Sequence, residues 1–319
     1  MKTHLVAFVV ASFFVSACSL LGANRQTGVA KPPGPQVKDV PYEARESRDG
    51  KDMSLRKRVM VLPFLDTAGT RDSRSAMVAR EAFIRQLRKT DDFVVVANSD
   101  FPKDVSAFLK GQQYDLEAMA KVASGMGVSA IIEGKIVDIR AKRIGDEVGL
   151  VRKIRARMNA KVQLRMVNTR NGSILLDEQR EAEVEEGTTR VAERASSDRG
   201  LEEDPVLVEA VVIKAFGATV SRLMNAVEKL SWEGRVALVK GDRIFLNAGR
   251  LSGLQVGDIL RISEDGEDVY DPENGSYIGR VPGRLKGTVE VISYFGKDGA
   301  IGIVHSGSGF RENDLVELY

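Results

Sequence analysis

Cysteine and histidine are almost absent from this chain of 319 residues, which contains one cysteine, Cys18, and two histidines, His4 and His305. A single cysteine can form no disulfide within the chain and cannot complete a cysteine-ligated metal site. Histidine-activated nucleophiles and multi-histidine zinc sites need partners that this chain scarcely has. We therefore predict a protein that is not an enzyme and that uses no metal or other cofactor.

Nucleotide-binding loops and a strong charge of one sign are missing as well. No Walker A loop and no GxGxxG sequence follows a predicted strand, so the phosphate cradle of a nucleotide-binding protein is not expected. The 47 lysines and arginines nearly balance the 45 aspartates and glutamates. A net charge of +2 gives no general attraction to nucleic acid. Neither a nucleic-acid partner nor a small-molecule substrate is predicted.

The N-terminus has the features of a secretory signal. Lys2 supplies a positive charge, and residues 5–17 form an apolar run that ends in small side chains. This run is shorter than the ~20 residues that a transmembrane helix needs. The sequence therefore predicts a signal peptide over residues 1–17.

The cysteine that follows gives this signal a more specific meaning. The tetrapeptide Val15-Ser16-Ala17-Cys18 resembles the lipobox of bacterial lipoproteins. The resemblance implies that Cys18 becomes the first residue of the mature protein and carries lipid, palmitate included. Ser19, where an aspartate would retain the protein, implies sorting to the outer membrane, with the chain facing the periplasm. An ordinary signal peptide with a chance cysteine is the alternative.

Residues 18–57 are predicted to form a flexible tether behind the lipid. Proline and charged residues are frequent there and apolar periodicity is lacking, so the segment cannot bury enough apolar surface to fold alone. Such a tether would let the folded part stand away from the membrane. Ordering of the segment against a partner is the alternative.

A sheet flanked by helices is predicted for residues 58–231, in the order β-α-β-α-β-β-β-α. Apolar runs and alternating patterns predict the strands, which occupy residues 58–64, 93–96, 130–141, 154–167 and 173–184. In the fourth strand one face is apolar, formed by Met158, Ala160, Val162, Leu164 and Met166. The turn Asn171-Gly172 is expected to join the last two strands, with Ile174 and Leu176 pointing inward.

Three helices are predicted within this domain. The first begins at Ser73 and runs to about Lys89, and the second begins after Asp115 and stops at Gly125. A single long helix is predicted after Asp204, where proline occupies the first helical turn; it runs to Val227.

Residues 232–319 are predicted to form a small all-β domain, because strand-sized runs alternate with glycine-rich turns and helical periodicity is lacking. The predicted strands occupy residues 235–239, 243–247, 259–263, 287–293, 300–305 and 314–318. Pro272 and Asn274-Gly275 predict a tight turn or hairpin between the third and fourth of these strands.

Several pieces of the first domain, taken in order, resemble the CsgG family and its TolB N-terminal-like relatives. They are RVMVLPF at 58–64, GVSAIIEGKI at 127–136, RMVNTRNGSIL at 165–175 and the long final helix. The resemblance implies an α/β (α+β) sheet-and-helix domain of an outer-membrane lipoprotein that faces the periplasm and often assembles into a ring.

The second domain resembles the SH3-like C-terminal domain of the FlgT family of flagellar assembly proteins. The matching pieces are LSGLQVGD at 251–258, DPENG at 271–275 with Ile278-Gly279, and NDLV at 313–316. This resemblance implies a small SH3-like barrel and a place in a periplasmic ring. The expected lipid anchor departs from that family's pattern.

Two segments occupy the positions at which curli-type members of the CsgG family insert hairpins into a membrane pore, roughly 141–158 and 178–204. The first is rich in lysine and arginine and the second in glutamate, and no aromatic residue lies between Asp115 and Ala215 to form a girdle. An arginine or lysine on the lipid face at mid-bilayer costs about 2–4 kcal/mol. We predict that no pore forms.

The opposite charges of these two segments predict a contact between subunits, because one segment could steer the other onto it. The candidate residues are Arg152, Arg155, Arg157, Glu183, Glu185 and Glu186. The alternative is two solvated strands that neutralise each other within one subunit.

Together these features predict a lipid-anchored scaffold that forms a homo-oligomer. Its expected partners are the membrane, through the N-terminal lipid, and proteins of an envelope machine such as a flagellar or secretion ring. Two other functions stay open: a subunit of a CsgG-type export channel, and a lipoprotein regulator of peptidoglycan synthesis.

Overall fold

The computed structural model describes residues 55–69, 73–145, 154–187, 202 and 204–319. The predicted signal peptide, the lipobox residues Val15, Ser16, Ala17 and Cys18, and nearly all of the tether lie outside the described residues. No helix in the described ranges is long and apolar enough to cross a membrane.

One mixed sheet organises residues 57–187, in the order β3-β1-β6-β7-β8, with β2 also paired to β6. Strand β1 is parallel to both β3 and β6, whereas β6, β7 and β8 are antiparallel to one another. The strands are β1 (Lys57–Val61), β2 (Leu65–Asp66), β3 (Phe93–Val96), β6 (Ala130–Gly145), β7 (Ile154–Asn168) and β8 (Ile174–Gly187). All five predicted strands of this domain are confirmed.

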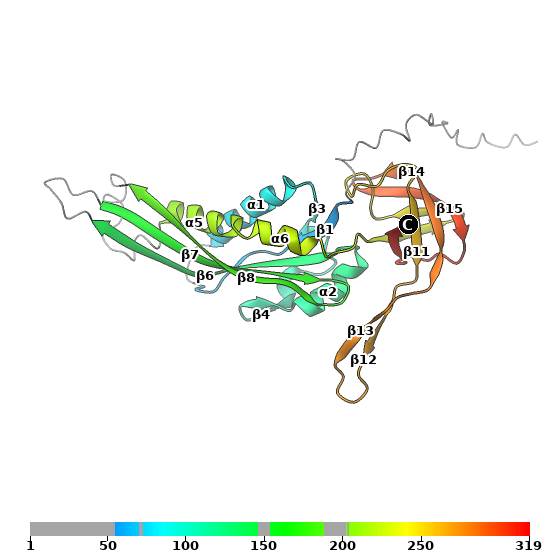
Figure 1. The fold of residues 1–319 in the computed structure, drawn as a ribbon, viewed down its shortest axis with the longest axis horizontal. Coiled ribbons are helices and arrows are strands. Elements are labelled where there is room, and N and C mark those ends of the chain that lie inside the picture. Colours follow the sequence, from blue (N-terminus) through cyan, green and yellow to red (C-terminus); the bar gives the residue numbers. More distant parts are fainter. Residues whose placement is uncertain (1–54, 70–72, 146–153, 188–201, 203) are drawn as a thin grey trace, which may run out of the picture. The chain divides into compact units, whose positions relative to one another are not determined.

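Helices cover both faces of this sheet, as Figure 1 shows. On one face, α1 (Ser73–Arg88), α5 (Pro205–Gly217) and α6 (Val220–Val227) pack over a core that includes Phe83 and Phe216. On the other face, α2 (Leu116–Gly125) packs over a smaller core with two short 3-10 helices. These are η2 (Asn98–Asp100) and η3 (Val105–Phe108), followed by the small ribbon of β4 (Leu109–Lys110) and β5 (Gln113–Tyr114). The predicted sheet flanked by helices is therefore confirmed.

The helix caps follow the sequence. The Asp115 carboxylate accepts the Ala118 N–H at 3.1 Å, and the Asp204 carboxylate accepts the Val206 N–H at 2.9 Å. Such bonds satisfy N–H groups that have no partner within a helix. Gly127, at φ +69°, ends the segment after α2. The N-caps predicted at Asp115 and Asp204 are confirmed, whereas Ser73, also predicted as a cap, is the first residue of α1.

The prediction of one long final helix is wrong, because the chain breaks between α5 and α6. The Thr219 hydroxyl is fully buried and donates to the Phe216 carbonyl at 2.7 Å. A threonine hydroxyl that bonds a nearby carbonyl competes with the helix ladder, which favours the break here. The predicted apolar stripe nevertheless packs on the sheet from both helices.

The predicted alternation of β7 is confirmed, because all five of its inward side chains are fully buried. The inward orientation predicted for Ile174 is wrong, since its side chain is 61% exposed. The pairing of β7 with β8 shifts between Met166 and Val167, so Leu175 and Leu176 both pack against the core while Ile174 does not. A bulge of this kind moves a side chain to the opposite face.

A closed six-stranded barrel follows, in the order β10-β15-β14-β11-β16-β9. Its strands are β9 (Gly234–Lys240), β10 (Arg243–Leu246), β11 (Ile259–Ser263), β14 (Leu285–Phe295), β15 (Gly299–Gly307) and β16 (Leu315–Leu318). Trp232 lies in the barrel core together with Ile244, Leu260 and Val289. The predicted small barrel and its six strands are confirmed.

A hairpin of two further strands projects from the barrel between β11 and β14 (Figure 1). It consists of β12 (Glu267–Tyr270) and β13 (Tyr277–Val281), which pair only with each other within the described residues. The predicted turn around Pro272 and Asn274-Gly275 closes it, and the Gly275 N–H donates to the Asp271 carbonyl at 2.8 Å.

Gly134 in β6 gives a test of the main core. An added Cβ at this position would lie 2.5 Å from a ring carbon of Phe64, and Phe64 itself stacks on Phe216 with centroids 4.3 Å apart. We expect Gly134→Ala to lower the free energy of unfolding by about 1–3 kcal/mol, because the buried ring must move. Urea denaturation measures the change.

Gly279 in β13 is the matched control, because an added Cβ there meets no atom within 4 Å. Gly279→Ala should leave the free energy of unfolding nearly unchanged. Equal losses for the two substitutions would contradict the close packing of Phe64 against β6.

Candidate functional site

The far half of the sheet is a three-stranded arm, formed by residues 138–145 of β6, 154–161 of β7 and 181–187 of β8. One face of this arm is apolar and packs against the α5 side of the protein, with Met158 and Ala160 fully buried. The other face carries alternating charged side chains. The arm is therefore amphipathic, as a sheet with one covered face should be.

Cross-strand ion pairs within one chain join the charges of this arm. Arg157 lies opposite Glu185, and its Nε donates to the Glu185 Oε1 at 2.8 Å. The same Nε lies 3.1 Å from the Glu183 Oε1, and Lys161 Nζ lies 3.8 Å from the Glu181 Oε1. The hydrogen bond to Glu185 raises the pKa of Arg157. These pairs match the alternative prediction, in which the two strands neutralise each other within one subunit.

The other candidates for self-association are not all described. Arg155 and Glu186 belong to β7 and β8 and lie beside this ladder in the strand register, but their side chains fall outside the described part. Arg152 lies outside the described residues altogether. A contact between subunits through these residues stays a prediction.

A second cluster of charges joins the sheet domain to the barrel, around Arg235 of β9. Its side chain is only 3% exposed. Its Nε donates to the Ser124 carbonyl of α2 at 3.1 Å, and one of its terminal nitrogens donates to the Asn313 carbonyl at 3.1 Å and lies 2.9 Å from the Asp265 carboxylate. Because these acceptors come from three separate segments, Arg235 holds α2, the barrel and the base of the hairpin together.

Arg170, on the turn between β7 and β8, forms the other half of this junction. Its guanidinium lies 2.8 Å from the Glu233 carboxylate and 3.7 Å from the Glu317 carboxylate of β16. Its main-chain carbonyl accepts from Arg280 of β13 at 3.3 Å, and Arg280 also pairs with Asp265 at 2.7 Å. The junction is therefore a network of ion pairs rather than an apolar contact.

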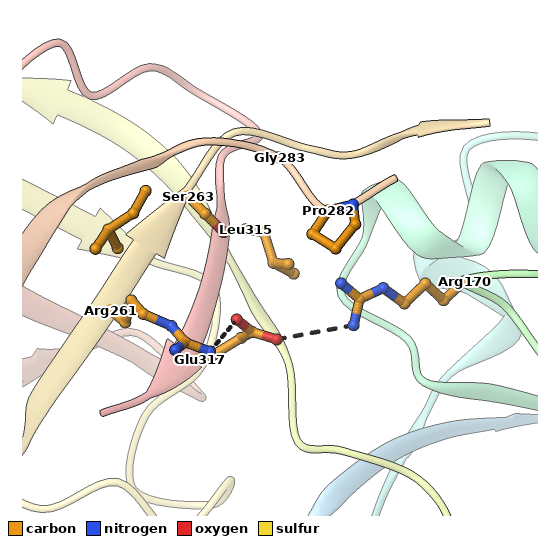
Figure 2. Close-up of a pocket in the computed structure, with 8 residues that line it drawn as sticks. Arg170, Arg261, Ser263, Pro282, Gly283, Leu315 and Glu317 are labelled. Atoms are coloured by element: carbon orange, nitrogen blue, oxygen red, sulfur yellow. Dashed lines mark hydrogen bonds and ion pairs between the residues drawn. The ribbon is translucent and has the colours of Figure 1, made fainter. Parts of the chain in front are cut away.

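A cavity of about 230 Å³ lies on the barrel side of this junction (Figure 2). Figure 2 shows the Glu317 carboxylate between two guanidinium groups, those of Arg170 and Arg261. Pro282 and Leu285 add an apolar wall. The two guanidinium groups and the carboxylate of the lining can bind a polar group.

Burial affects the acid at the centre of the junction. It raises the pKa of Glu233, and the nearby Glu317 adds to the rise, whereas Arg170 and Arg235 oppose it. The ionised form of Glu233 is therefore less favourable in the folded protein than in the unfolded chain. Arg170 is the ion-pair partner that limits this cost.

No pattern in the sequence predicts this junction. Arg170 and Glu233 are 63 positions apart, and Arg235 and Asp265 belong to elements that sequence patterns do not place together. Arg170 belongs to the piece at 165–175 that resembles the CsgG family, but the resemblance assigns it no function. Two adjacent features, the strong turn at Asn171-Gly172 and the start of the barrel, were the available signals.

No family model matches the chain, and no curated protein matches it. The resemblance to the CsgG family and that of the barrel to the FlgT family therefore stay predictions. Within the described ranges, no group of three or more histidine, cysteine, aspartate or glutamate side chains is placed to hold a metal ion.

Several solved structures of bacterial proteins show a limited likeness to this chain. Hypothetical protein CT253 from Chlamydia trachomatis is 15% identical, with 54% of this chain and 98% of that chain covered and a TM-score of 0.35. Lipoprotein GNA1162 from Neisseria meningitidis is also 15% identical over the same shares, with a TM-score of 0.26. A PelC dodecamer from Paraburkholderia phytofirmans is 13% identical over 50% of this chain and 88% of that chain, with a TM-score of 0.24. At these scores we draw no conclusion from them.

The Arg170–Glu233 pair gives a test of the junction. We expect Arg170→Met to lower the free energy of unfolding by about 1–3 kcal/mol near pH 7, because it leaves a largely buried carboxylate without its partner. The folded pKa of Glu233 is raised, so its contribution to stability is present at low pH and falls as pH rises through that pKa. Because the loss of Arg170 raises the pKa of Glu233 further, the difference in free energy of unfolding between Arg170→Met and the wild type should be smaller at about pH 4 than near pH 7. Urea denaturation at both pH values measures it.

Arg261→Met is the control, because Arg261 is 46% exposed and pairs with Glu317 rather than Glu233. It should cost little and show no such dependence on pH. A deficit of Arg170→Met that is the same at both pH values would mean that Glu233 is not the group left unpaired.

Proposed function

We propose that this protein is a lipoprotein of the outer membrane, anchored by lipid at Cys18, that faces the periplasm. It acts without catalysis as an assembly component of an envelope machine, a ring of the flagellar or secretion type. The observation that carries the proposal is the combination of a lipobox-like N-terminus with two folded parts joined by the charged junction around Arg170 and Arg235. Such a junction presents both parts to a partner in a fixed relation.

The surface of the barrel supports a role in binding. On the β12–β13 hairpin, Ile278 is 64% exposed, Val281 is 55% exposed and Val269 is 37% exposed. A two-stranded hairpin is marginally stable in water on its own, and neighbouring exposed apolar side chains are typical of interaction surfaces. This hairpin is the part of the barrel best suited to contact another envelope protein.

The arm supports assembly in a different way. Its charged face would place Arg157 and the glutamates of β8 at the surface of each subunit. These side chains are already paired within the chain, so a contact between subunits would have to add to those pairs or replace them. Electrostatic steering of one subunit toward the next needs no loss of the internal pairs.

Lipid attachment and assembly can be measured on the same preparation. We expect mass spectrometry of the membrane-extracted protein to find an N-terminal lipidated cysteine, and Cys18→Ala to release the chain from the outer-membrane fraction. Electron microscopy in detergent should show discrete oligomers. In planar bilayers, these oligomers should not conduct ions. Unmodified Cys18 would overturn the anchor, monomers at all concentrations would overturn the assembly role, and ion conductance would favour an export channel.

The arm can be tested by charge reversal at low salt. We expect the variant Glu183→Lys, Glu185→Lys and Glu186→Lys to weaken self-association. The control, with the same change in net charge at exposed acids away from the arm, is Asp242→Lys, Glu273→Lys and Glu312→Lys. Adding Arg157→Glu to the first variant restores opposite charges across β7 and β8, which separates local misfolding from loss of a contact. Unchanged association in the first variant would contradict the arm interface.

A further inference from the structure

A groove runs along the outer edge of β3, between this strand and the barrel. Its volume is about 360 Å³. Residues 93–97 form one side, Leu251, Lys297 and Asp298 form the barrel side, and arginines complete the lining. We call this feature the β3 groove; its cationic side chains are Arg56, Arg58, Arg88 and Lys297.

The backbone of β3 is open toward this groove. β3 is the terminal strand of the sheet and pairs with β1 on its inner side. The Lys57 N–H donates to the Asp92 carbonyl at 2.9 Å. Because main-chain groups alternate in direction along a strand, Val94 also faces β1, whereas the N–H and C=O of Phe93 and Val95 point away from β1 at the outer edge of the sheet. Both residues line the groove. An edge of this kind is a template for another strand.

On two other free edges of the sheet, one main-chain group is bonded to a side chain. On the β6 edge the Glu202 carboxylate accepts the Ala141 N–H at 3.1 Å, and on the β8 edge Lys214 Nζ donates to the Glu183 carbonyl at 2.9 Å. Side chains that occupy edge groups in this way discourage pairing with a further strand. The β3 edge faces a groove instead.

Arg58 gives the groove a preference for negative charge. One of its terminal nitrogens donates to the Asn247 carbonyl, but its Nε is buried and has no hydrogen-bond partner among the described residues. Burial lowers the pKa of Arg58, against the opposing effect of Asp298 and Asp100. A buried guanidinium donor without an acceptor is costly, and a carboxylate is its best acceptor.

Three acids line the groove beside its four cationic side chains: Asp91, Asp100 and Asp298. Asp91 pairs with Arg56 at 3.4 Å. Asp298 accepts the N–H groups of Gly249 at 2.9 Å and Ser252 at 3.1 Å, and also the Ser252 hydroxyl. Arg88 and Lys297 are exposed and have no ion pair within the described part. Asp100 is exposed and accepts the Ser99 hydroxyl at 3.4 Å. The cationic side chains of the groove therefore outnumber its acids by one, four against three.

We propose that the β3 groove binds an extended acidic segment of a partner protein, which adds a strand to the outer edge of β3. Main-chain bonds to Phe93 and Val95 hold the segment, and a carboxylate accepts from Arg58. Addition of a strand to a sheet edge is an established mode of peptide recognition, with backbone bonds for affinity and side-chain sites for specificity. The proposal requires neither lipid at Cys18 nor assembly of the chain.

The strand register defines the pattern of the segment. Met60 belongs to the core beneath α2, whereas Val59 and Val61 belong to the core beneath α1. Alternation along β1 therefore places Arg58 on the α2 face, level with Val94. Every second residue of an added strand lies on that face. Acidic side chains at alternate positions, with small apolar ones between them, fit this arrangement.

A labelled peptide with this pattern tests the proposal. The probe is the acetylated sequence Glu-Ala-Glu-Val-Glu, and its control is Lys-Ala-Lys-Val-Lys, both followed by fluorescence anisotropy with the full chain in detergent. We expect the acidic peptide to bind at least 10-fold more tightly than the basic one. Hydrogen exchange at the Val95 amide should be fast in the free protein and slow with the acidic peptide.

Separate variants address the backbone and the charges. Val95→Pro removes the N–H that faces the groove while sparing the bonds to β1, and we expect at least 10-fold weaker binding. Arg58→Met should also weaken binding of the acidic peptide. Arg88→Glu and Lys297→Glu should weaken it too, and because these two side chains are exposed, their substitution leaves the interior intact. Lys229→Met removes an exposed cation on the α6 side and should change nothing.

Three results would overturn the proposal. Equal binding of the two peptides would remove the preference for acid, and wild-type affinity in Val95→Pro would remove the added strand. A Val95 amide already protected without peptide would mean that the groove is filled by this chain or a second copy. Mass photometry of Val95→Pro distinguishes this chain from a second copy as the occupant, because only the loss of a second copy lowers the mass of the particle.

Discussion

The buried guanidinium of Arg235 is the interaction on which the relation between sheet and barrel depends. A cation that is 3% exposed must be surrounded by acceptors, and its acceptors belong to α2, to the turn before β16 and to the base of the projecting hairpin. Arg280 shares the same Asp265 carboxylate and reaches back to the Arg170 carbonyl. Three structural elements are thereby tied to one charge, and the movement of any of them removes one of its three acceptors.

Unequal covering of the sheet explains where the other charges lie. Near β1 both faces are covered, and the strand is apolar on each: Val59 and Val61 face one core while Met60 faces the other. Along β7 helices cover one face, so Met158 and Ala160 alternate with Arg157 and Lys161. Opposite charges on neighbouring strands then pair across the ladder. The described residues of these charged segments, Arg157, Glu183 and Glu185, thus lie on the solvent face of a half-covered sheet.

Features set by local sequence could be predicted, and features set by distant contacts could not. The strands, the Asp115 and Asp204 caps and the barrel follow from apolar periodicity and turn residues within short windows. The break at Thr219 could not be predicted, because the apolar stripe of the helix continues through it. The outward orientation of Ile174 could not be predicted either, because it results from a one-residue bulge. The Arg170–Glu233 pair joins residues 63 positions apart. No pattern in the sequence connects them, because each is an ordinary charged residue, Arg170 beside a turn and Glu233 at the start of the barrel.

The β3 edge lies close to the residues at which the folded part begins. Arg56 lines the β3 groove and donates through its main-chain N–H to the Ser252 carbonyl of the barrel at 3.1 Å. Leu55 packs against the barrel core. The chain that leads back to Cys18 therefore joins the folded part at the mouth of this groove. A strand bound on β3 would therefore lie beside Leu55 and Arg56, where the predicted tether meets the sheet and the barrel.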